Sequence, residues 1–292
     1  MKFSWGSRTS RLYIEYAVLV LLALGCAFVW VVVYARTPPG VLTFAVLNVG
    51  QGEAIFIESP TGARMLIDAG PDDSILQELP RVMPLFNHQL SAIVETYPDP
   101  AHDTGFVDLL KRYSVGAFIE SGITTKDAAA ASVEREVASQ KIPRYIAMRG
   151  TVLDLGGGAY LQMLWPRTAV LAKSAVVSDS SMVVRLSYGN FSVLLMSDVS
   201  KQIENDLMTA DGKNLQSTIL GVGKYGSDSA TGAQFVADVH PSAASISVGD
   251  NVYGFPSPAT LQIFSSNHVP VFRTDSHGTI IFKSDGQNFW AE

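Results

Sequence analysis

The sequence has 292 residues, of which 47% are hydrophobic and 16% are charged, with 24 glycines and 14 prolines. This composition is typical of a globular chain and excludes disorder, collagen and coiled coil as the main architecture. The single cysteine, Cys26, excludes a disulfide framework and cysteine-rich zinc sites, so any metal must rest on histidines and carboxylates. Residues 1–39 carry a net charge of +3, which leaves −9 for residues 40–292, and an acidic body disfavours nucleic acid as a partner.

A long apolar run near the N-terminus predicts one transmembrane helix over residues 16–35. The run contains no charged or amide side chain. At about 1.5 Å per residue it crosses a hydrocarbon layer of ~30 Å as a helix. A cleaved signal peptide is the alternative, but its apolar region is shorter than this run. We therefore expect a single-pass membrane anchor.

The flanks of this run predict its orientation. Three basic residues precede it and one follows it, which favours a cytoplasmic N-terminal segment, residues 1–15, and an extracytoplasmic body. The segment Thr37-Pro38-Pro39-Gly40 cannot continue a helix, so residues 36–41 are predicted as a linker. No second linker or short-period repeat follows, and residues 42–292 are treated as one domain.

The first half of this domain begins with three short apolar segments separated by turns rich in glycine and proline. We predict an antiparallel meander of strands 42–47, 54–58 and 64–67. An alternation of helices and strands follows. Its predicted members are helix 74–85, strand 92–96, helix 105–113, strand 116–120 and helix 126–140.

The second half has the same style of strands followed by helices. Its predicted strands are 159–164, 182–187, 191–196, 218–222, 244–248, 269–272 and 279–283, and its predicted helices are 201–208, 232–238 and 258–266. Two such halves predict an α/β domain with two packed, mixed sheets and helices on the outside.

Acidic and histidine side chains at the ends of apolar strands are the candidate functional residues. Asp68 and Asp198 each follow a predicted strand directly, and Asp99 and His102 lie three residues apart in a predicted loop, where they can face one ion. Turn or helix capping is the alternative role for the aspartates, and Asp103 is a candidate N-cap. The other four histidines lie in predicted helix ends or turns.

Several segments around these residues resemble the metallo-β-lactamase-fold domain of ComEC-type bacterial competence proteins and their free-standing relatives. The resemblance covers roughly residues 42–286, and its motifs occur in the same order. The matching segments are Phe44 to Ala54, Leu66 to Pro71, Ser180 to Leu186, Leu194 to Asp198, Lys224 to Ser227, Asn251 to Pro258 and Phe272 to Gly278.

This resemblance implies a four-layer αββα sandwich with a metal cluster, usually of two ions, where the loops meet at one edge. Asp99, His102 and Asp198 are the retained ligand positions, with Asp68 in support. Other positions at which the family has metal-site residues carry different side chains here. The displaced positions are Tyr97, Ala101, Lys224, Tyr225 and Phe255.

The number of lost ligands predicts that the metal site is weak or lost, because a hydrolytic site needs enough imidazoles and carboxylates to hold its cations and activate a water. An ammonium group at Lys224 repels cations and is predicted to pair with Asp198 or Asp99, while Tyr97 and Phe255 fill the vacated volume. No cofactor is expected. If the site is active, zinc or manganese is its expected metal.

The leading hypothesis is therefore a membrane-anchored pseudoenzyme that acts as a binding or scaffold module, with a protein partner. The alternative is a metal-dependent phosphodiesterase or nuclease with one ion held by Asp99, His102 and Asp198. A nucleic-acid role without catalysis is a third hypothesis. It would rest on a basic patch formed by Lys111, Arg112, Arg135, Lys141 and Arg144, although such charges usually form a solvated face.

Overall fold

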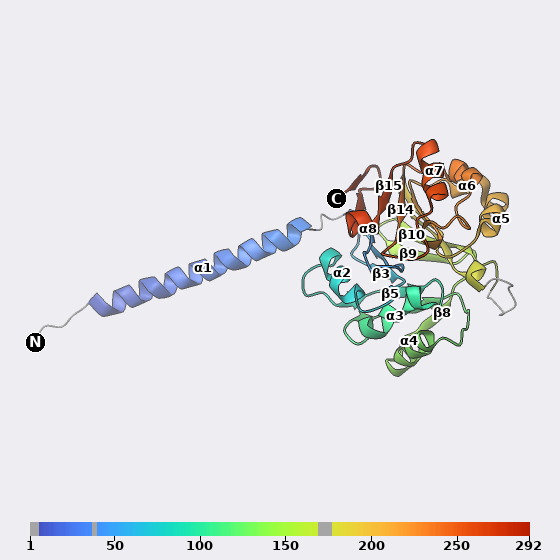
Figure 1. Cartoon of the computed structure of the whole chain (residues 1–292). Helices are drawn as coiled ribbons and strands as arrows, with labels where there is room; N and C mark the ends of the chain where they lie inside the picture. Colours follow the sequence, from blue (N-terminus) through green and yellow to red (C-terminus); the bar gives the residue numbers. More distant parts are fainter. Residues whose placement is uncertain (1–5, 37–39, 169–176) are drawn as a thin grey trace, which may run out of the picture. The chain divides into compact units, whose positions relative to one another are not determined.

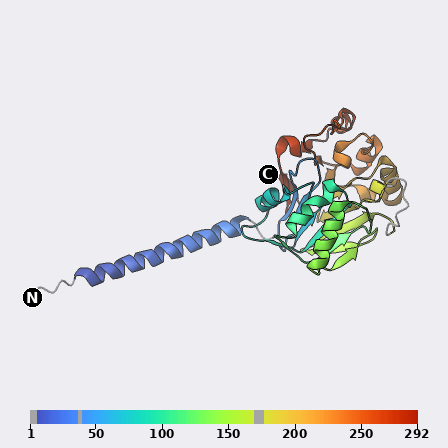
Figure 2. The same ribbon diagram turned by 60° about the horizontal axis from the view of Figure 1, so that its bottom comes forward.

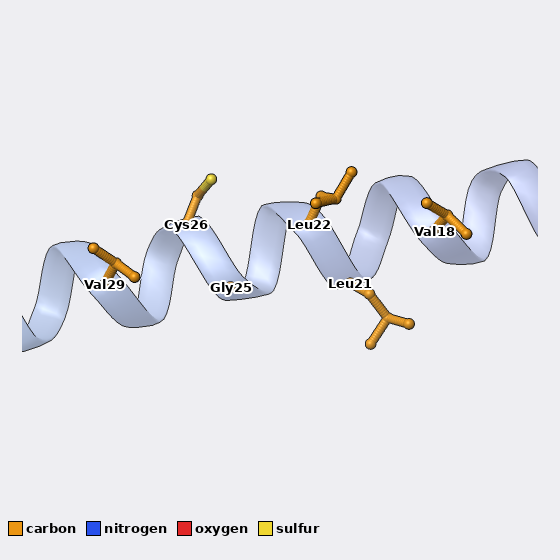
Figure 3. A pocket seen from close by; sticks show the side chains of 6 residues that line it. All are labelled: Val18, Leu21, Leu22, Gly25, Cys26 and Val29. Carbon is orange, nitrogen blue, oxygen red and sulfur yellow. The ribbon is translucent and has the colours of Figure 1, made fainter.

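The computed structural model describes residues 6–36, 40–168 and 177–292, and the chain divides into two compact units, residues 1–39 and 40–292. The first unit is helix α1 (Gly6–Arg36), which contains the predicted apolar run. Its window Leu12–Val29 is long and apolar enough to cross a membrane. Cys26 is exposed on this helix, and Figure 3 draws it among neighbouring apolar side chains. Residues 37–39 of the predicted linker lie outside the described residues.

The first sheet of the second unit has the strand order β17-β16-β1-β2-β3-β5-β7-β8. Strands β1 to β3 pair antiparallel, as predicted, and β3, β5, β7 and β8 pair in parallel. The strand near the C-terminus, β16, returns to pair with β1. The bounds are β1 (Leu42–Val46), β2 (Ile55–Glu58), β3 (Arg64–Ile67), β5 (Ala92–Glu95), β7 (Phe118–Glu120), β8 (Arg144–Ile146), β16 (Ile280–Ser284) and β17 (Phe289–Ala291).

The second sheet has the order β15-β14-β13-β12-β11-β10-β9. Strands β9 to β12 form an antiparallel meander, and β12 to β15 pair in parallel. The bounds are β9 (Val152–Gly156), β10 (Ala159–Trp165), β11 (Val183–Tyr188), β12 (Phe191–Leu195), β13 (Ile219–Gly221), β14 (Ala243–Ile246) and β15 (Val271–Arg273). A small parallel pair, β4 (Gln89–Leu90) with β6 (Ser114–Val115), stands apart.

Helices cover the outer face of each sheet (Figures 1 and 2). The first sheet is covered by α2 (Ile75–Val82), α3 (Pro100–Leu109) and α4 (Ala128–Ser139), and the second by α5 (Lys201–Asp211), α6 (Ala233–Val239) and α7 (Pro258–Ser266). Helix α8 (Thr274–His277) and the 3-10 turns η1 (Val177–Ser180), η2 (Gly212–Leu215) and η3 (Lys224–Gly226) lie in connections. The predicted four-layer αββα arrangement is therefore confirmed.

Successive side chains of each strand point to opposite faces of its sheet, so every strand contributes to two cores. On β2, Ile55 and Ile57 join the core between the two sheets, whereas Phe56 joins the core under α2 and α3. On β11, Val184 faces the core between the sheets and Val183 faces the helices of the second sheet. Because both faces of these strands are buried, their sequence is apolar at nearly every position.

The sequence-based boundaries are wrong at one element that matters for the site. Helix α3 begins at Pro100, five residues before the predicted start near residue 105. Asp99 is its N-cap and accepts a hydrogen bond from the Ala101 backbone at 3.1 Å, and Pro100 suits the first helical turn because it needs no amide donor. Asp103, the predicted cap, lies inside the helix instead. His102 is consequently held on a helix rather than in a loop.

Gly105 allows α3 to approach the segment that follows Asp68. A Cβ atom at residue 105 would lie 2.1 Å from the carbonyl oxygen of Ala69, and the Gly105 amide donates to the Gly70 oxygen at 3.0 Å. The Ala69 amide in turn donates to the His102 carbonyl at 2.7 Å. This close approach positions His102 beside Asp68.

We predict that Gly105→Ala lowers the free energy of unfolding by about 1–3 kcal/mol, because the added methyl group collides with backbone. Helix propensity alone predicts the opposite sign, a gain of about 1 kcal/mol. Urea unfolding of the purified chain measures the difference. Thr104→Ala, one residue earlier in the same helix, is the control, because it adds no atom beside the Ala69 carbonyl and should stay close to the parent. A stabilised Gly105→Ala variant would contradict the close approach.

Candidate functional site

The candidate site lies where strand ends of the two sheets meet. Asp68 follows β3, Thr96 follows β5, and Ser197 and Asp198 follow β12. Tyr225 lies in η3, after β13. Parallel strands that end at one edge bring their following loops together, which is why segments far apart in sequence converge here.

His102 is the centre of this cluster and is fully buried. Its Nδ1 lies 2.7 Å from Oδ2 of Asp68. On the other side of the ring, Nε2 lies 3.0 Å from the Tyr225 hydroxyl and 3.4 Å from Oδ1 of Asp198. Both ring nitrogens are therefore occupied by protein side chains.

Asp68 is held in place by Thr96 as well as by His102. The Thr96 amide donates to Oδ1 of Asp68 at 2.8 Å, and the Thr96 hydroxyl donates to Oδ2 at 2.5 Å. The same hydroxyl lies 2.8 Å from the Ser197 hydroxyl, 101 residues further along the chain. These buried contacts join the strand ends of the two sheets and satisfy the Asp68 carboxylate completely.

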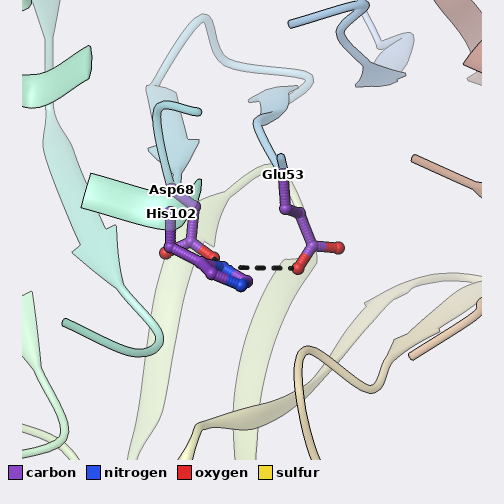
Figure 4. A group of neighbouring side chains, drawn as sticks. All are labelled: Glu53, Asp68 and His102. Carbon is purple, nitrogen blue, oxygen red and sulfur yellow. Dashed lines mark hydrogen bonds and ion pairs between the residues drawn. The ribbon is translucent and has the colours of Figure 1, made fainter. Parts of the chain in front are cut away.

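Glu53 approaches the histidine from the turn before β2, and Figure 4 shows its carboxylate directed at the His102 ring. Its Oε2 lies 3.8 Å from Nδ1 of His102. Glu53, Asp68 and His102 form a group whose ligand-type atoms all lie within 4.8 Å of one another. This is the arrangement to test for a metal ion.

The geometry does not fit an ion held by this group. Two ligands of one tetrahedral zinc, each at about 2.0–2.1 Å, are separated by roughly 3.3 Å. Nδ1 of His102 and Oδ2 of Asp68 are only 2.7 Å apart, which is a hydrogen-bond distance. The Asp68 oxygens are also already used by Thr96. These distances exclude an ion between Nδ1 of His102 and Asp68, and the fit of an ion on the Nε2 side depends on Tyr225 and Asp198.

The electrostatics favour a protonated imidazole. Burial opposes a charge on His102, but the carboxylates of Asp68 and Asp198 raise its pKa above 6.5, and the neutral Tyr225 hydroxyl can accept a hydrogen bond from the ring. An imidazolium has two N–H donors and no lone pair for a metal. Burial raises the pKa of Tyr225, which keeps its hydroxyl neutral, and burial raises the pKa of Glu53 to about 8. His102 thus supplies the positive charge of the cluster.

The structure places the other predicted ligand, Asp99, in a capping role. Its carboxylate accepts from the Ala101 amide at the start of α3, and no bond joins it to His102 or Asp198 among the described side chains. The Ala101 carbonyl accepts from the Glu53 amide at 3.1 Å. Tyr97 packs against the edge of the His102 ring, with ring centroids 6.0 Å apart.

The prediction that Lys224 neutralises Asp198 or Asp99 is wrong. Within the residues that the structure describes, no ion pair joins Lys224 to either carboxylate, and the nearest cationic partner of Asp198 is His102. Lys224 lies in a left-handed turn, with φ of 48°, and its amide donates to the Ser197 carbonyl. The physical reason is that the buried histidine already supplies the countercharge.

Phe255 does not fill the volume beside His102 either. Its ring stacks on Tyr253, with centroids 5.6 Å apart, and packs against the core of the second sheet. The ring that contacts the histidine from this side is Tyr225, with centroids 6.2 Å apart. Tyr225, predicted from the resemblance to stand at a displaced ligand position, therefore hydrogen-bonds the histidine.

Sequence reasoning did not identify Glu53, Thr96 and Ser197 as site residues. Glu53 follows the glycine turn Gly50-Gln51-Gly52, and Ser197 has a φ of 46°, which marks a strained turn beside a strand end. A hydroxyl residue after an apolar strand gives no sequence signal for such a role. Only the pairing of the strand ends brings these side chains to Asp68.

The predicted basic patch is neutralised in part. Arg144 contacts Glu120 at 2.7 Å and Glu134 at 3.6 Å, and Lys111 contacts Asp108 at 2.9 Å. Arg135 donates to a serine hydroxyl on its own helix, which leaves its charge in place. Two of the five residues are therefore in ion pairs with carboxylates within the described part of the chain.

Comparison with known proteins agrees with this architecture. No protein-family model matches the sequence. The chain is 28% identical over 260 residues to ComE operon protein 3 of Bacillus subtilis, covering 81% of this chain and 32% of the relative. It is 24% identical over 250 residues to competence protein ComA of Neisseria gonorrhoeae, covering 84% and 33%. The chain thus spans about a third of the length of these curated relatives.

Among solved structures, the metallo-β-lactamase fold protein YhfI of Bacillus subtilis superposes with a TM-score of 0.57 at 10% identity. The superposition covers 84% of this chain and 99% of that protein. A likeness at this identity concerns the fold. Together the comparisons confirm a metallo-β-lactamase-fold domain similar to that of ComEC-type competence proteins.

We predict that the free energy of unfolding falls as the pH rises from 4.5 to about 8. Between 4.5 and about 8, folded Glu53 holds a proton that the unfolded chain releases, so rising pH favours unfolding. The raised pKa of His102 adds stability that is complete below 6.5 and is lost as the pH rises through its folded value. Urea unfolding at a series of pH values measures the profile.

Glu53→Gln should reduce the slope of this profile between pH 4.5 and 8, because it removes one titrating carboxyl. Part of the slope remains, since burial also raises the pKa of Asp103 to about 7 and that of Glu95 above its usual value. Asp73→Asn, which removes an exposed carboxylate before α2, is the control and should follow the parent profile. An unchanged slope in Glu53→Gln would contradict the buried, protonated state of Glu53.

We also predict that Asp99→Ala lowers the free energy of unfolding by about 1 kcal/mol, because α3 loses its N-cap, whereas Asp99→Asn, which can still cap, stays close to the parent. Chemical unfolding of both variants makes the comparison. Equal destabilisation by asparagine and alanine would mean that the carboxylate charge, rather than capping, is what the site requires.

Proposed function

We propose that this chain is a membrane-anchored, non-catalytic binding or scaffold module, in which a buried ion-pair network replaces the metal centre of the metallo-β-lactamase fold. The observation that carries the proposal is the occupation of both His102 ring nitrogens by Asp68, Tyr225 and Asp198. A metal ligand must offer a free lone pair, and the Tyr225 hydroxyl occupies the Nε2 side of the ring, where an ion would bind. Tyr225 stands at a displaced ligand position, and its neutral hydroxyl hydrogen-bonds Nε2 of His102.

The membrane part of the proposal rests on α1 and its flanking charges. One helix among the described residues is long and apolar enough to span a bilayer. The excess of basic residues before it favours a cytoplasmic N-terminus, so that residues 42–292 act outside the cytoplasm. The charge of this domain favours a protein partner over a nucleic acid, although the matched relatives are named as competence proteins.

A metal-dependent phosphodiesterase is the second candidate. The observation in its favour is the convergence of Glu53, Asp68 and His102 at one strand edge, with Asp198 on the other side of the ring. For this activity the ion would be bound by Nε2 of His102 and by Asp198, whose Oδ1 lies 3.4 Å away. The Tyr225 hydroxyl would have to leave Nε2. The His102–Asp68 hydrogen bond could stay, because a ligating histidine usually donates its other N–H to a carboxylate.

Metal analysis of the purified full chain, together with a generic phosphodiester assay, separates the two candidates. We predict less than stoichiometric zinc and manganese and no hydrolysis of bis(p-nitrophenyl) phosphate. The matched comparison is a variant with Tyr97→His, Ala101→Asp, Lys224→His and Tyr225→His, which restores the donor types that a zinc site requires. This variant should bind zinc, and adding His102→Ala to it should weaken that binding.

A parent chain that retains one equivalent of metal and loses phosphodiesterase turnover on His102→Ala would overturn the proposal. That result would establish the second candidate instead.

A further inference from the structure

A second polar cavity lies at the opposite end of the second sheet from His102. It has a volume of about 340 Å³ and is lined by residues at the beginning of β12, β13 and β14. The site described above follows the other ends of the first two of these strands. The lining residues used here are Arg185, Ser192, Gln216, Thr218, His240 and Ser242.

Arg185 is the feature that distinguishes this cavity. Its Nη1 donates to the Ser187 hydroxyl at 2.7 Å, and its Nη2 donates to the Gln216 carbonyl at 3.0 Å. Its Nε is buried and has no hydrogen-bond partner. A guanidinium group has five N–H donors, so three remain uncommitted.

Arg185 also lacks a countercharge. Four arginines are half-buried among the residues whose burial the structure describes, and three of them, Arg64, Arg149 and Arg273, contact a carboxylate. The fourth, Arg185, contacts none among the described side chains. The residues outside the description include no aspartate or glutamate that could serve. Burial without a partner lowers the pKa of Arg185.

The rest of the lining suits an anion. It consists of hydroxyl, amide and imidazole side chains with no carboxylate, in a domain whose net charge is strongly negative. The Ser192 oxygen accepts from the Thr218 amide at 3.3 Å, which leaves its hydroxyl proton free to donate. His240 and Ser242 are exposed at the rim. Half-burying a cation without compensation is costly, and a bound anion removes that cost.

We propose that this cavity is a binding site for a phosphate monoester, with the Arg185 guanidinium as its principal contact. A phosphate monoester supplies up to two negative charges and three strong acceptor oxygens, which match the uncommitted guanidinium and hydroxyl donors. The ligand is a small soluble molecule, because the acidic domain disfavours the approach of a polyanion.

The test titrates inorganic phosphate into the isotopically labelled full chain in detergent micelles and follows backbone amide resonances. Saturable shifts should appear at residues 185, 192, 216–218 and 240–242. Arg185→Gln should weaken the affinity by about tenfold or more, since a charge-assisted hydrogen bond is worth about 1.5–3 kcal/mol. Lys213→Gln is the matched control, because it removes the same charge from an exposed position in the adjacent η2. Its affinity should stay within about twofold.

A second variant covers the case in which Arg185→Gln fails to fold. Ser242→Glu places a carboxylate at the exposed rim and should abolish phosphate binding while the fold is kept. Absence of saturable shifts in the parent chain, or unchanged affinity in Ser242→Glu, would overturn the proposal. Arg185 would then have only a structural role, in which its hydrogen bond to the Gln216 carbonyl connects β11 to the segment before β13.

The ligand class is tested with two small molecules, methyl phosphate, which is a monoester, and dimethyl phosphate, which is a diester with one charge fewer. Tighter binding of methyl phosphate, with inorganic phosphate as competitor, supports recognition of a monoester. Equal binding of the two molecules, or binding of neither, would overturn it. None of these measurements depends on metal binding at His102.

Discussion

The arrangement around His102 depends on one interaction, the buried contact between its Nδ1 and the Asp68 carboxylate. Asp68 is fixed by two hydrogen bonds from Thr96, and Thr96 in turn contacts Ser197. This chain of contacts holds the ends of β3, β5 and β12 together. In a water-free setting each of these bonds is strong, and each unpaired group would be costly, so the network favours a single arrangement.

The same contact determines how the negative charges of Asp68 and Asp198 are balanced. In an active metal centre, cations balance the carboxylates, whereas here the imidazolium of His102 lies between Asp68 and Asp198. Tyr225 contributes a hydroxyl that needs no countercharge. The lysine at position 224 is not needed for neutralisation, and its left-handed backbone belongs to the turn that presents Tyr225. The proposed loss of catalysis therefore has a specific structural basis, the Tyr225 hydroxyl that occupies Nε2 of His102.

Two ends of one sheet would then have different roles. The ends of β12 and β13 carry the closed His102 network, while their beginnings border an open cavity with an uncompensated guanidinium. The rigid strands of a fold position side chains at both of their ends, whatever chemistry one end carries. The binding role that we propose therefore does not depend on the state of the His102 site.

Much of the fold followed from the sequence, because apolar runs of four to six residues separated by glycine and proline turns specify strands locally. The αββα layering and the strand-end positions of Asp68 and Asp198 were predictable on that basis, with a family resemblance to support them. The helical position of His102, the capping role of Asp99 and the identity of the countercharge were decided only by tertiary structure. All three features depend on which strand ends meet in the folded domain and on how burial shifts the pKa of each side chain. No short segment of sequence determines either of these by itself.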